Sequence, residues 1–275
     1  MMRTGLLLGD LHCGSMFAPC PEGFVTHTGS VHQPNICQRY LNTCWHDMCD
    51  TLPALDWLVL AGDMVDGEQP KDAAHFIWET DALYQIMAAL ELLKPVLARV
   101  RDGGAVYILE GSRYHTGIGA LGDEALGRML GVPRRGVWSR KPWLLLNVDG
   151  ITLDIAHRQS MASVYPVRVL ESELQAVLMR AATAGEVAPY AVIRHHTHNE
   201  YLVAARGLRV ACAVPAWQVQ THYAQVSVSP NRLYSAYIGS VLVHVEAERL
   251  RRLQPPVWFE PILYEHPRAE KEELA

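Results

Sequence analysis

Histidine is concentrated in one segment of the sequence, "VIRHHTHNE" at residues 192–200. Three of its residues, His195, His196 and His198, follow an apolar run and precede a polar stretch. Imidazole nitrogens bind transition metals, but histidines also serve as surface or core groups. Residues elsewhere in the chain must therefore decide between metal binding and a structural role.

Other apolar runs also end in residues that are able to bind metals. The clusters that follow them are "GDLHCG" at 9–14, "GDMVDGE" at 62–68, "GSRYH" at 111–115 and "AHR" at 156–158. With the histidine-rich segment, they supply these metal-competent residues: Asp10, His12, Asp63, Asp66, Ser112, His115, His157, His196 and His198. A mixture of imidazoles and carboxylates favours manganese, iron or zinc over calcium or magnesium.

A pair of such ions would carry out one kind of chemistry. Two metal ions about 3.5–4 Å apart clamp and hydrolyse a phosphate ester. One carboxylate has to bridge the pair. We expect Asp63 in this role because it lies near the middle of the series when the ligands are taken in sequence order. In an extended segment, residues i and i+2 point the same way. We therefore expect Asp10 and His12 to share an ion, and likewise His196 and His198.

Alternating strands and helices are expected to bring these clusters together. The apolar pattern predicts buried strands at 5–9, 56–61 and 105–110, and helices at 36–52 and 71–100. The second helix is expected to kink or break near Pro95. The segment 13–35 is predicted to be a long loop. This alternation predicts a mostly parallel sheet that holds its ligands beyond the carboxyl ends of the strands.

The second half of the chain has a different pattern. Hairpins are predicted at Asp149-Gly150 and near Arg206-Gly207, and further strands at 190–198 and 235–248. A helix is predicted at 167–186, with Gly185 as its stop. We expect a single domain over residues 1–265, followed by a charged tail at 266–275 that frays.

The composition excludes several classes of protein. The 275 residues are 49% hydrophobic and 19% charged, which indicates a globular protein with a sizeable core. The net charge of −5, without a long basic run, argues against electrostatic binding of duplex nucleic acid. The six cysteines form no C-x-x-C pair, so we expect reduced thiols in a cytoplasmic protein. No stretch is typical of a signal peptide or a membrane span, and the pattern leaves the oligomeric state open.

In their order, the clusters resemble the calcineurin-like metallophosphoesterase superfamily. The family pattern is D-x-H, G-D-x-x-D, G-N-H-D/E, a lone H and G-H-x-H, and the matching residues here run from 9 to 198. Phage and prophage members look most similar overall, including the "VPAWQ" stretch at 214–218. The resemblance implies an α/β fold, a four-layer αββα sandwich of two mixed β-sheets flanked by helices, with a dinuclear site at the sheet edge.

Transferred residue by residue, the resemblance implies two metal sites that share one carboxylate. The first set is Asp10, His12, Asp63 and His198. The second set is Asp63, His157, His196 and the residue at the family's asparagine position. The cofactors would be two divalent metal ions, manganese first, with iron, zinc or nickel as alternatives.

The asparagine position departs from the family pattern, because "GNH" has become "GSRYH". Alignment on Gly111 puts Ser112 there, and a serine hydroxyl is a poorer ligand than an amide oxygen. Alignment on the histidine puts Tyr114 there and retains His115. The glycine before the last H-x-H is also replaced, by His195, for which we expect a packing or supporting role.

The resemblance also implies catalytic roles outside the ligands. His115 matches the histidine that stabilises the leaving group, and Arg113 and Arg158 are candidates for neutralising the phosphoryl oxygens. Salt bridges to nearby carboxylates are an equal alternative for both arginines. For Asp66 we favour support of the site over direct ligation.

The predicted function is metal-dependent hydrolysis of a phosphate ester, most readily a phosphodiester in a nucleotide or nucleic acid. A phosphomonoesterase, including a protein phosphatase, is the closest alternative. A non-catalytic binding module on the same fold is a second one. The serine at the asparagine position favours a further alternative, a decayed, metal-free relative kept as a structural module.

Overall fold

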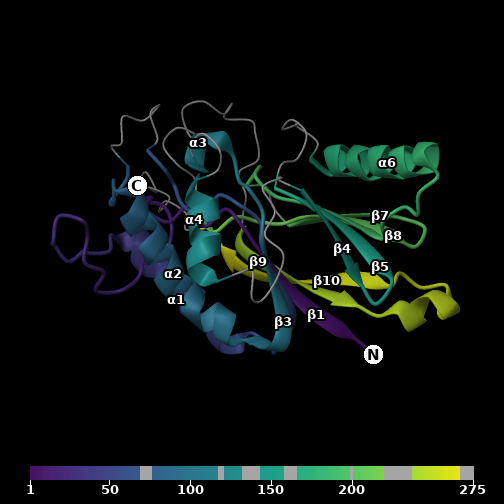
Figure 1. The fold of residues 1–275 in the computed structure, drawn as a ribbon, viewed down its shortest axis with the longest axis horizontal. Helices are drawn as coiled ribbons and strands as arrows, with labels where there is room; N and C mark the ends of the chain where they lie inside the picture. The colour runs from purple at the N-terminus through teal and green to yellow at the C-terminus, as the bar shows by residue number, and fades with distance from the viewer. Residues whose placement is uncertain are drawn as a thin grey trace, which may run out of the picture.

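The computed structural model describes residues 1–68, 76–116, 121–131, 143–157, 166–198, 201–219 and 237–266. Two five-stranded sheets lie between helices (Figure 1). The strand order is β10-β9-β1-β2-β3 in the first sheet and β4-β5-β6-β8-β7 in the second. Both sheets mix parallel and antiparallel pairs, as the resemblance implies.

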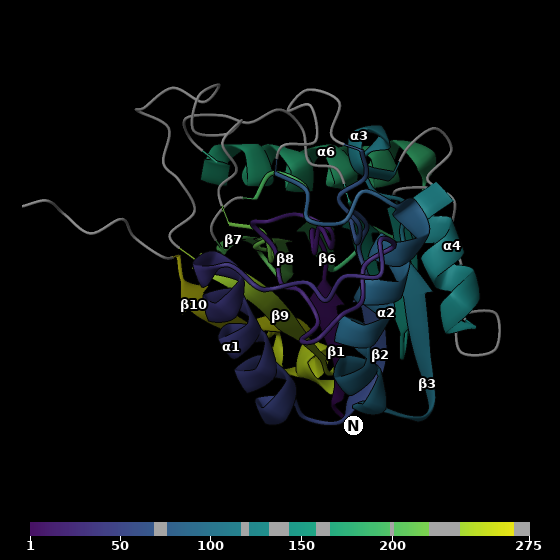
Figure 2. The same cartoon turned by 90° about the vertical axis from the view of Figure 1, so that its left-hand side faces the viewer.

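The first sheet is built around a parallel centre. Its strands are β1 (Arg3–Leu8), β2 (Leu55–Leu60), β3 (Val100–Ile108), β9 (Tyr237–Val245) and β10 (Val257–Glu265). Helices α1 (Ile36–Thr51), α2 (Ala82–Ala98) and α4 (Leu121–Leu130) cover one face of this sheet (Figure 2). Along β1, Leu6 and Leu8 pack against these helices, whereas Leu7 joins the core on the other face. This alternation follows from the two-residue period of a strand.

The second sheet forms the other half of the sandwich. Its strands are β4 (Trp143–Val148), β5 (Ile151–Ala156), β6 (Ala191–Arg194), β7 (Leu202–Arg206) and β8 (Arg209–Ala213). One face packs against the first sheet through Leu153, Ile155 and Ile193, and the other is covered by α6 (Pro166–Ala184). The layers are therefore helices, sheet, sheet and helix, which confirms the predicted four-layer αββα sandwich. The short elements α3 (Arg113–Thr116) and η1 (Ala247–Arg252) complete the described secondary structure.

The hairpins and the first helix follow from local sequence chemistry. Asp149 and Gly150 both have positive φ angles, of 49° and 85°, as a tight turn between β4 and β5 requires. Helix α1 starts at a capping box, in which the Asn35 side chain accepts from the Gln38 backbone and the Gln38 side chain accepts from the Asn35 backbone.

The helix predicted at 71–100 is wrong in its start, and of the two alternatives expected near Pro95, a kink or a break, the break does not occur. Asp81 caps α2 by accepting from the backbone of Leu83 and Tyr84, so the helix begins at Ala82. Residues 69–75 lie outside the described ranges. Pro95 lies inside the helix, three residues before its last residue, Ala98, and does not break it.

One strand prediction needs correction, and one strand was missed. The strand predicted at 190–198 covers only Ala191–Arg194, so the three histidines lie beyond its end. Strand β10 was not predicted, because Pro261 interrupts its apolar pattern. Since β10 is an edge strand, the missing N–H of Pro261 costs it little. It pairs with β9 over its whole length.

The six cysteines are free thiols, as predicted. Among the described helices, none has both the length and the apolar character needed to cross a membrane. The proposed tail begins at His266, and its residues 267–275 lie outside the described part of the chain.

Candidate metal centre

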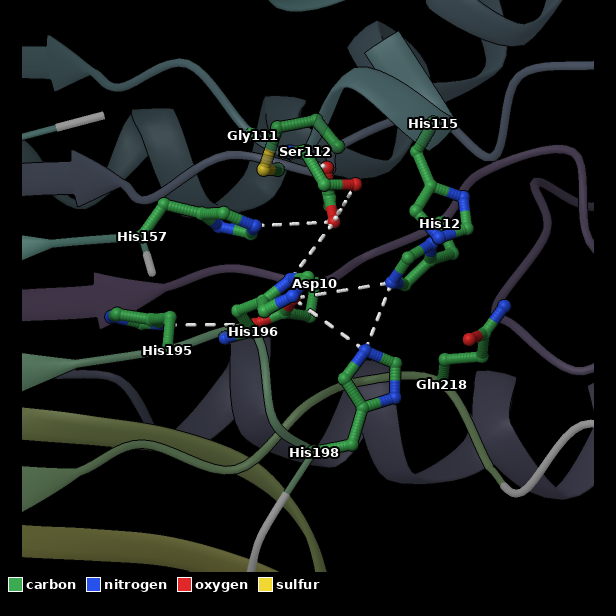
Figure 3. Close-up of polar contacts among 12 residues, drawn as sticks. Asp10, His12, Gly111, Ser112, His115, His157, His195, His196, His198 and Gln218 are labelled. Carbon is green, nitrogen blue, oxygen red and sulfur yellow. Dashed lines mark hydrogen bonds and ion pairs between the residues drawn. The ribbon is translucent and has the colours of Figure 1, made fainter. Parts of the chain in front are cut away.

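Acidic and imidazole side chains from both sheets meet at one edge of the sandwich (Figure 3). They follow the ends of β1, β2, β5 and β6, as the parallel arrangement predicts. Three overlapping groups have ligand atoms within 4.8 Å of one another: Asp10, Asp63, His157 and His196; Asp10, His12 and His198; and His12, Asp63 and His115. The structure thus brings together predicted ligands that are separated by up to 188 positions in the sequence, from Asp10 to His198.

The group around His12 has the spacing of a metal coordination sphere. The Nε2 atoms of His12 and His198 lie 3.1 Å apart, and Asp10 Oδ1 lies 3.9 Å from the first and 3.5 Å from the second. Ligands about 2.0–2.1 Å from a tetrahedral ion lie roughly 3.4 Å from each other. The three atoms therefore surround a volume that suits one ion.

A second group surrounds Asp63. Its Oδ2 lies 3.1 Å from His157 Nε2 and 3.8 Å from His196 Nδ1. The other nitrogen of His157, Nδ1, lies 2.7 Å from the Ala61 carbonyl and donates to it. This bond puts a proton on Nδ1, so Nε2 is the nitrogen that would bind a ligand once its own proton has left.

Two buried atoms of the predicted ligands lack hydrogen-bond partners among the described residues. They are Asp10 Oδ1 and His157 Nε2, and both residues are at most 1% exposed. His157 Nε2 is close to Asp63 but does not have the geometry of a hydrogen bond. Buried polar atoms without partners are costly unless something else satisfies them. A divalent cation would satisfy both, so the residues present fit the metals that the resemblance implies.

The backbone at the ligands is strained. Asp10, His12, Asp63, His196 and His198 have positive φ angles between 47° and 76°. Non-glycine residues rarely adopt this conformation, and it concentrates at functional sites. The expectation that extended alternation pairs these residues is therefore wrong in its geometry. Asp10 and His12 do share a group, but His196 and His198 belong to different ones.

The acidic and imidazole side chains of the cluster shift one another's pKa values. Burial disfavours a charged His157, but the Asp63 carboxylate outweighs burial and raises the pKa of His157 to about 9. The same holds for His115: burial lowers its pKa, but the carboxylates of Asp66 and Asp63 outweigh this effect and raise the pKa to about 9. Burial instead lowers the pKa of His12 to about 4. The surrounding imidazoles hold the pKa of Asp63 far below its usual range, against the effect of burial.

Asp66 supports the site. Its Oδ1 accepts from His12 Nδ1 at 3.2 Å and from Gln218 Nε2 at 3.3 Å. Gln218 also donates to Ser15 Oγ, and it is only 5% exposed. Gln218 was not predicted as a site residue. The one indication in the sequence was that it belongs to the "VPAWQ" stretch, which is part of the family resemblance.

Ser112 contacts the cluster through Asp63. Its backbone N–H and its hydroxyl donate to the two Asp63 oxygens, at 2.6 and 3.0 Å. The hydroxyl oxygen retains lone pairs, and its role as a metal ligand stays a prediction. Tyr114 and His115 lie on α3, with their rings edge-on 4.9 Å apart.

His115 lies beside His12, with their ring centroids 4.3 Å apart and edge-on. Its Nδ1 lies 2.9 Å from the Asp66 carbonyl, so this nitrogen donates and Nε2 is the nitrogen left for other contacts. His195 lies behind Asp10, with Nδ1 3.7 Å from Asp10 Oδ2 and the whole side chain buried. This position suits the supporting role expected of it.

Only one of the two arginines predicted to contact phosphate lies in the described part of the chain. Arg113 begins α3, the helix that also carries His115, and it is exposed; its contact with phosphate stays a prediction. Arg158 lies outside the described residues.

A further buried carboxylate, Asp123, was also missed. It lies on α4, is 1% exposed and accepts from the backbone N–H of Met64 and Gly111. The family pattern has an acidic residue directly after the histidine, where this chain has Thr116. Asp123 is the next acidic residue along the chain. The acidic residue of the family pattern could therefore have been sought there, seven positions later.

No family model and no curated protein matches the sequence. Solved structures of similar shape include an archaeal phosphodiesterase, at 10% identity and a TM-score of 0.42 over 94% of this chain and 99% of that one. A predicted phosphoesterase from Streptococcus pneumoniae TIGR4 has 8% identity and a TM-score of 0.37 over 90% and 84%. A single mutant of Vps29 from Entamoeba histolytica has 13% identity and a TM-score of 0.40 over 95% and 99%.

Likeness at these identities and scores transfers no activity. None of the three is named as a phage protein, so the narrower phage-type resemblance gains no support. Any functional conclusion must come from the metal centre itself.

Proposed function

We propose that this chain is a metal-dependent phosphoesterase of the calcineurin-like type. One observation carries the proposal: carboxylates and imidazoles from four strand ends converge at ligand spacing around buried atoms that lack hydrogen-bond partners among the described residues. Packing alone does not readily explain such an arrangement of metal-competent side chains, several of which have strained backbones.

The residues divide between two cations that share Asp63. Asp10, His12 and His198 would hold one cation, and Asp63, His157 and His196 would hold the other, with Asp10 also within reach of the second set. That Asp63 also reaches the first cation rests on the resemblance. When bound, the pair supplies an activated water nucleophile and positive charge for the phosphoryl oxygens. The imidazole-rich donor set favours manganese, with iron, zinc or nickel as alternatives.

The remaining residues position groups and move a proton. Because Nδ1 of His115 donates to the Asp66 carbonyl, Nε2 is the atom that would give a proton to the leaving oxygen. Asp66 holds the ring of His12 in place through Nδ1. Arg113 and Arg158 stay candidates for binding the phosphoryl oxygens.

The proposed substrate is a phosphodiester, in a nucleotide or in nucleic acid. This narrower step rests on the resemblance, whose branches act on such substrates. The chain's negative charge indicates that any nucleic acid would be recognised locally, at the site, since the chain has no long basic run.

The test compares two chromogenic substrates on metal-loaded protein. Bis-p-nitrophenyl phosphate and p-nitrophenyl phosphate are each supplied with manganese, and the metal is then chelated. Diester turnover that chelation abolishes is the expected result. Turnover of the monoester alone would contradict the diester proposal but retain the metal-dependent reaction. Silence with both substrates, in a folded and metal-loaded sample, would contradict the enzyme proposal and favour a binding module.

A further inference from the structure

Asp63, the proposed bridging carboxylate, stands where two loops touch. The loop after β2 carries Gly62, Asp63 and Met64, and the loop after β3 carries Gly111 and Ser112. A Cβ added at Gly62 would lie 2.6 Å from the Gly111 backbone, and one added at Gly111 would lie 2.1 Å from Asp63 Oδ1. Backbone contact this close requires glycine on both sides.

Asp123 bonds to the backbone of both loops. Its Oδ1 accepts from the Met64 N–H at 3.2 Å, and its Oδ2 accepts from the Gly111 N–H at 2.8 Å. Both donors are backbone groups next to residues of the cluster, one in each loop. Asp123 lies in the first turn of α4 and is 1% exposed, so it makes these bonds away from bulk water.

We propose that Asp123 is a positioning residue that sets the separation of the two loops and thereby the place of Asp63. The inference rests on the proposed metal site. The chain of contacts is short: Asp123 holds the Gly111 N–H, and the next residue, Ser112, donates from both its N–H and its hydroxyl to Asp63. Residues that hold a ligand in this way tune metal affinity without touching the metal.

The carboxylate is specifically suited to this role. Each of its two oxygens accepts one N–H, and an asparagine side chain has only one acceptor oxygen. Asp123→Asn therefore keeps the side-chain volume, but its NH₂ group would face one of the two backbone N–H groups, so that two donors oppose each other. A structural role in packing α4 would tolerate this change far better than a role in loop placement.

Manganese binding to metal-free protein, measured by calorimetry, tests the inference. Asp123→Asn is expected to weaken manganese affinity by about tenfold or more, the effect typical of residues that support a metal ligand. The matched control is Leu126→Ala, on the same helix and fully buried. It should lower the melting temperature while leaving manganese affinity within about threefold of wild type, since it makes no hydrogen bond to either loop.

Each outcome is decisive. Wild-type affinity in Asp123→Asn, or an equal loss in Leu126→Ala, would overturn the inference while the metal site stands. Wild-type protein that binds no manganese would overturn the proposed function and this inference with it. If Asp123→Asn does not fold, amide exchange in the wild type decides: Met64 and Gly111 N–H should be strongly protected, and rapid exchange at both would overturn the role of Asp123.

Discussion

Asp63 is the side chain on which the residue-scale account depends. Its carboxylate faces His157 and His196 and also receives both donors of Ser112, so removing its charge disturbs every neighbour at once. Two of the neighbouring histidines, His157 and His115, have pKa values raised to about 9 by nearby carboxylates. A cation would take over the charge balance that these protons now provide.

Asp63→Asn should abolish turnover and weaken manganese binding by more than about 100-fold, because it removes the charge and the shared ligand oxygen. Calorimetry and the diester assay measure the two effects. Asp56→Asn, near the start of β2 and thus at the opposite end of that strand from Asp63, is the control and should retain both properties. Turnover retained by Asp63→Asn would contradict the bridging role.

His115→Ala should lower the turnover number by about 100-fold or more with little change in manganese stoichiometry, since its proposed task is proton transfer to the leaving oxygen. The turnover number for a substrate with a very acidic leaving group should fall less in this variant, because such a leaving group departs without a proton. Loss of bound metal in this variant would show that His115 is a ligand instead.

Manganese affinity should rise as the pH increases from 7 to 9. The pKa of His157 is raised to about 9, so at pH 7 its proton has to leave before Nε2 can bind a cation. One displaced proton corresponds to about a tenfold gain in affinity per pH unit below that pKa. In metal-free protein the same raised pKa contributes stability below about pH 6.5, and that contribution is lost as the pH rises through about 9. Affinity that is constant over this range would contradict a protonated His157.

At the scale of elements, strand ends place the ligands and glycines let the loops approach. The positions of the ligands were predictable, because apolar runs that end in Asp and His clusters identify the carboxyl ends of parallel strands. Their conformation was not, since Asp10 and His198 have left-handed backbones that an alternating pattern cannot indicate. Asp123 and Gln218 also escaped prediction, because each acts through long-range contacts whose partners only the fold brings near.

Gly111→Ala should destabilise the protein by about 1–3 kcal/mol, because the added Cβ would lie 2.1 Å from Asp63 Oδ1 and 2.2 Å from its backbone nitrogen. Chemical unfolding measures this loss, and manganese affinity should fall with it. Gly103→Ala is the control: it has a φ of +77° but open space, so it costs backbone strain alone. Gly111→Ala with wild-type metal affinity would contradict the close contact of the two loops.

At the scale of the whole molecule, the two sheets bring distant parts of the chain to one edge. The α/β class was predictable from the strand and helix alternation of the first half, and the sandwich from the resemblance. The start of α2 and the strand β10 were not predictable from the apolar pattern. Asp81 caps α2 inside an apolar stretch, and Pro261 interrupts the apolar pattern of the edge strand β10. The division of the ligands between the sheets explains why none of the clusters is informative alone: β1 and β2 belong to one sheet, and β5 and β6 to the other.

Anomalous diffraction from crystals grown with manganese tests the central claim most directly. The account predicts two peaks about 3.5–4 Å apart, one beside Asp10, His12 and His198 and one beside His157 and His196, with Asp63 between them. A single peak would contradict the dinuclear arrangement. Crystals that diffract well and show no peak at this edge of the sandwich would contradict the metal centre itself.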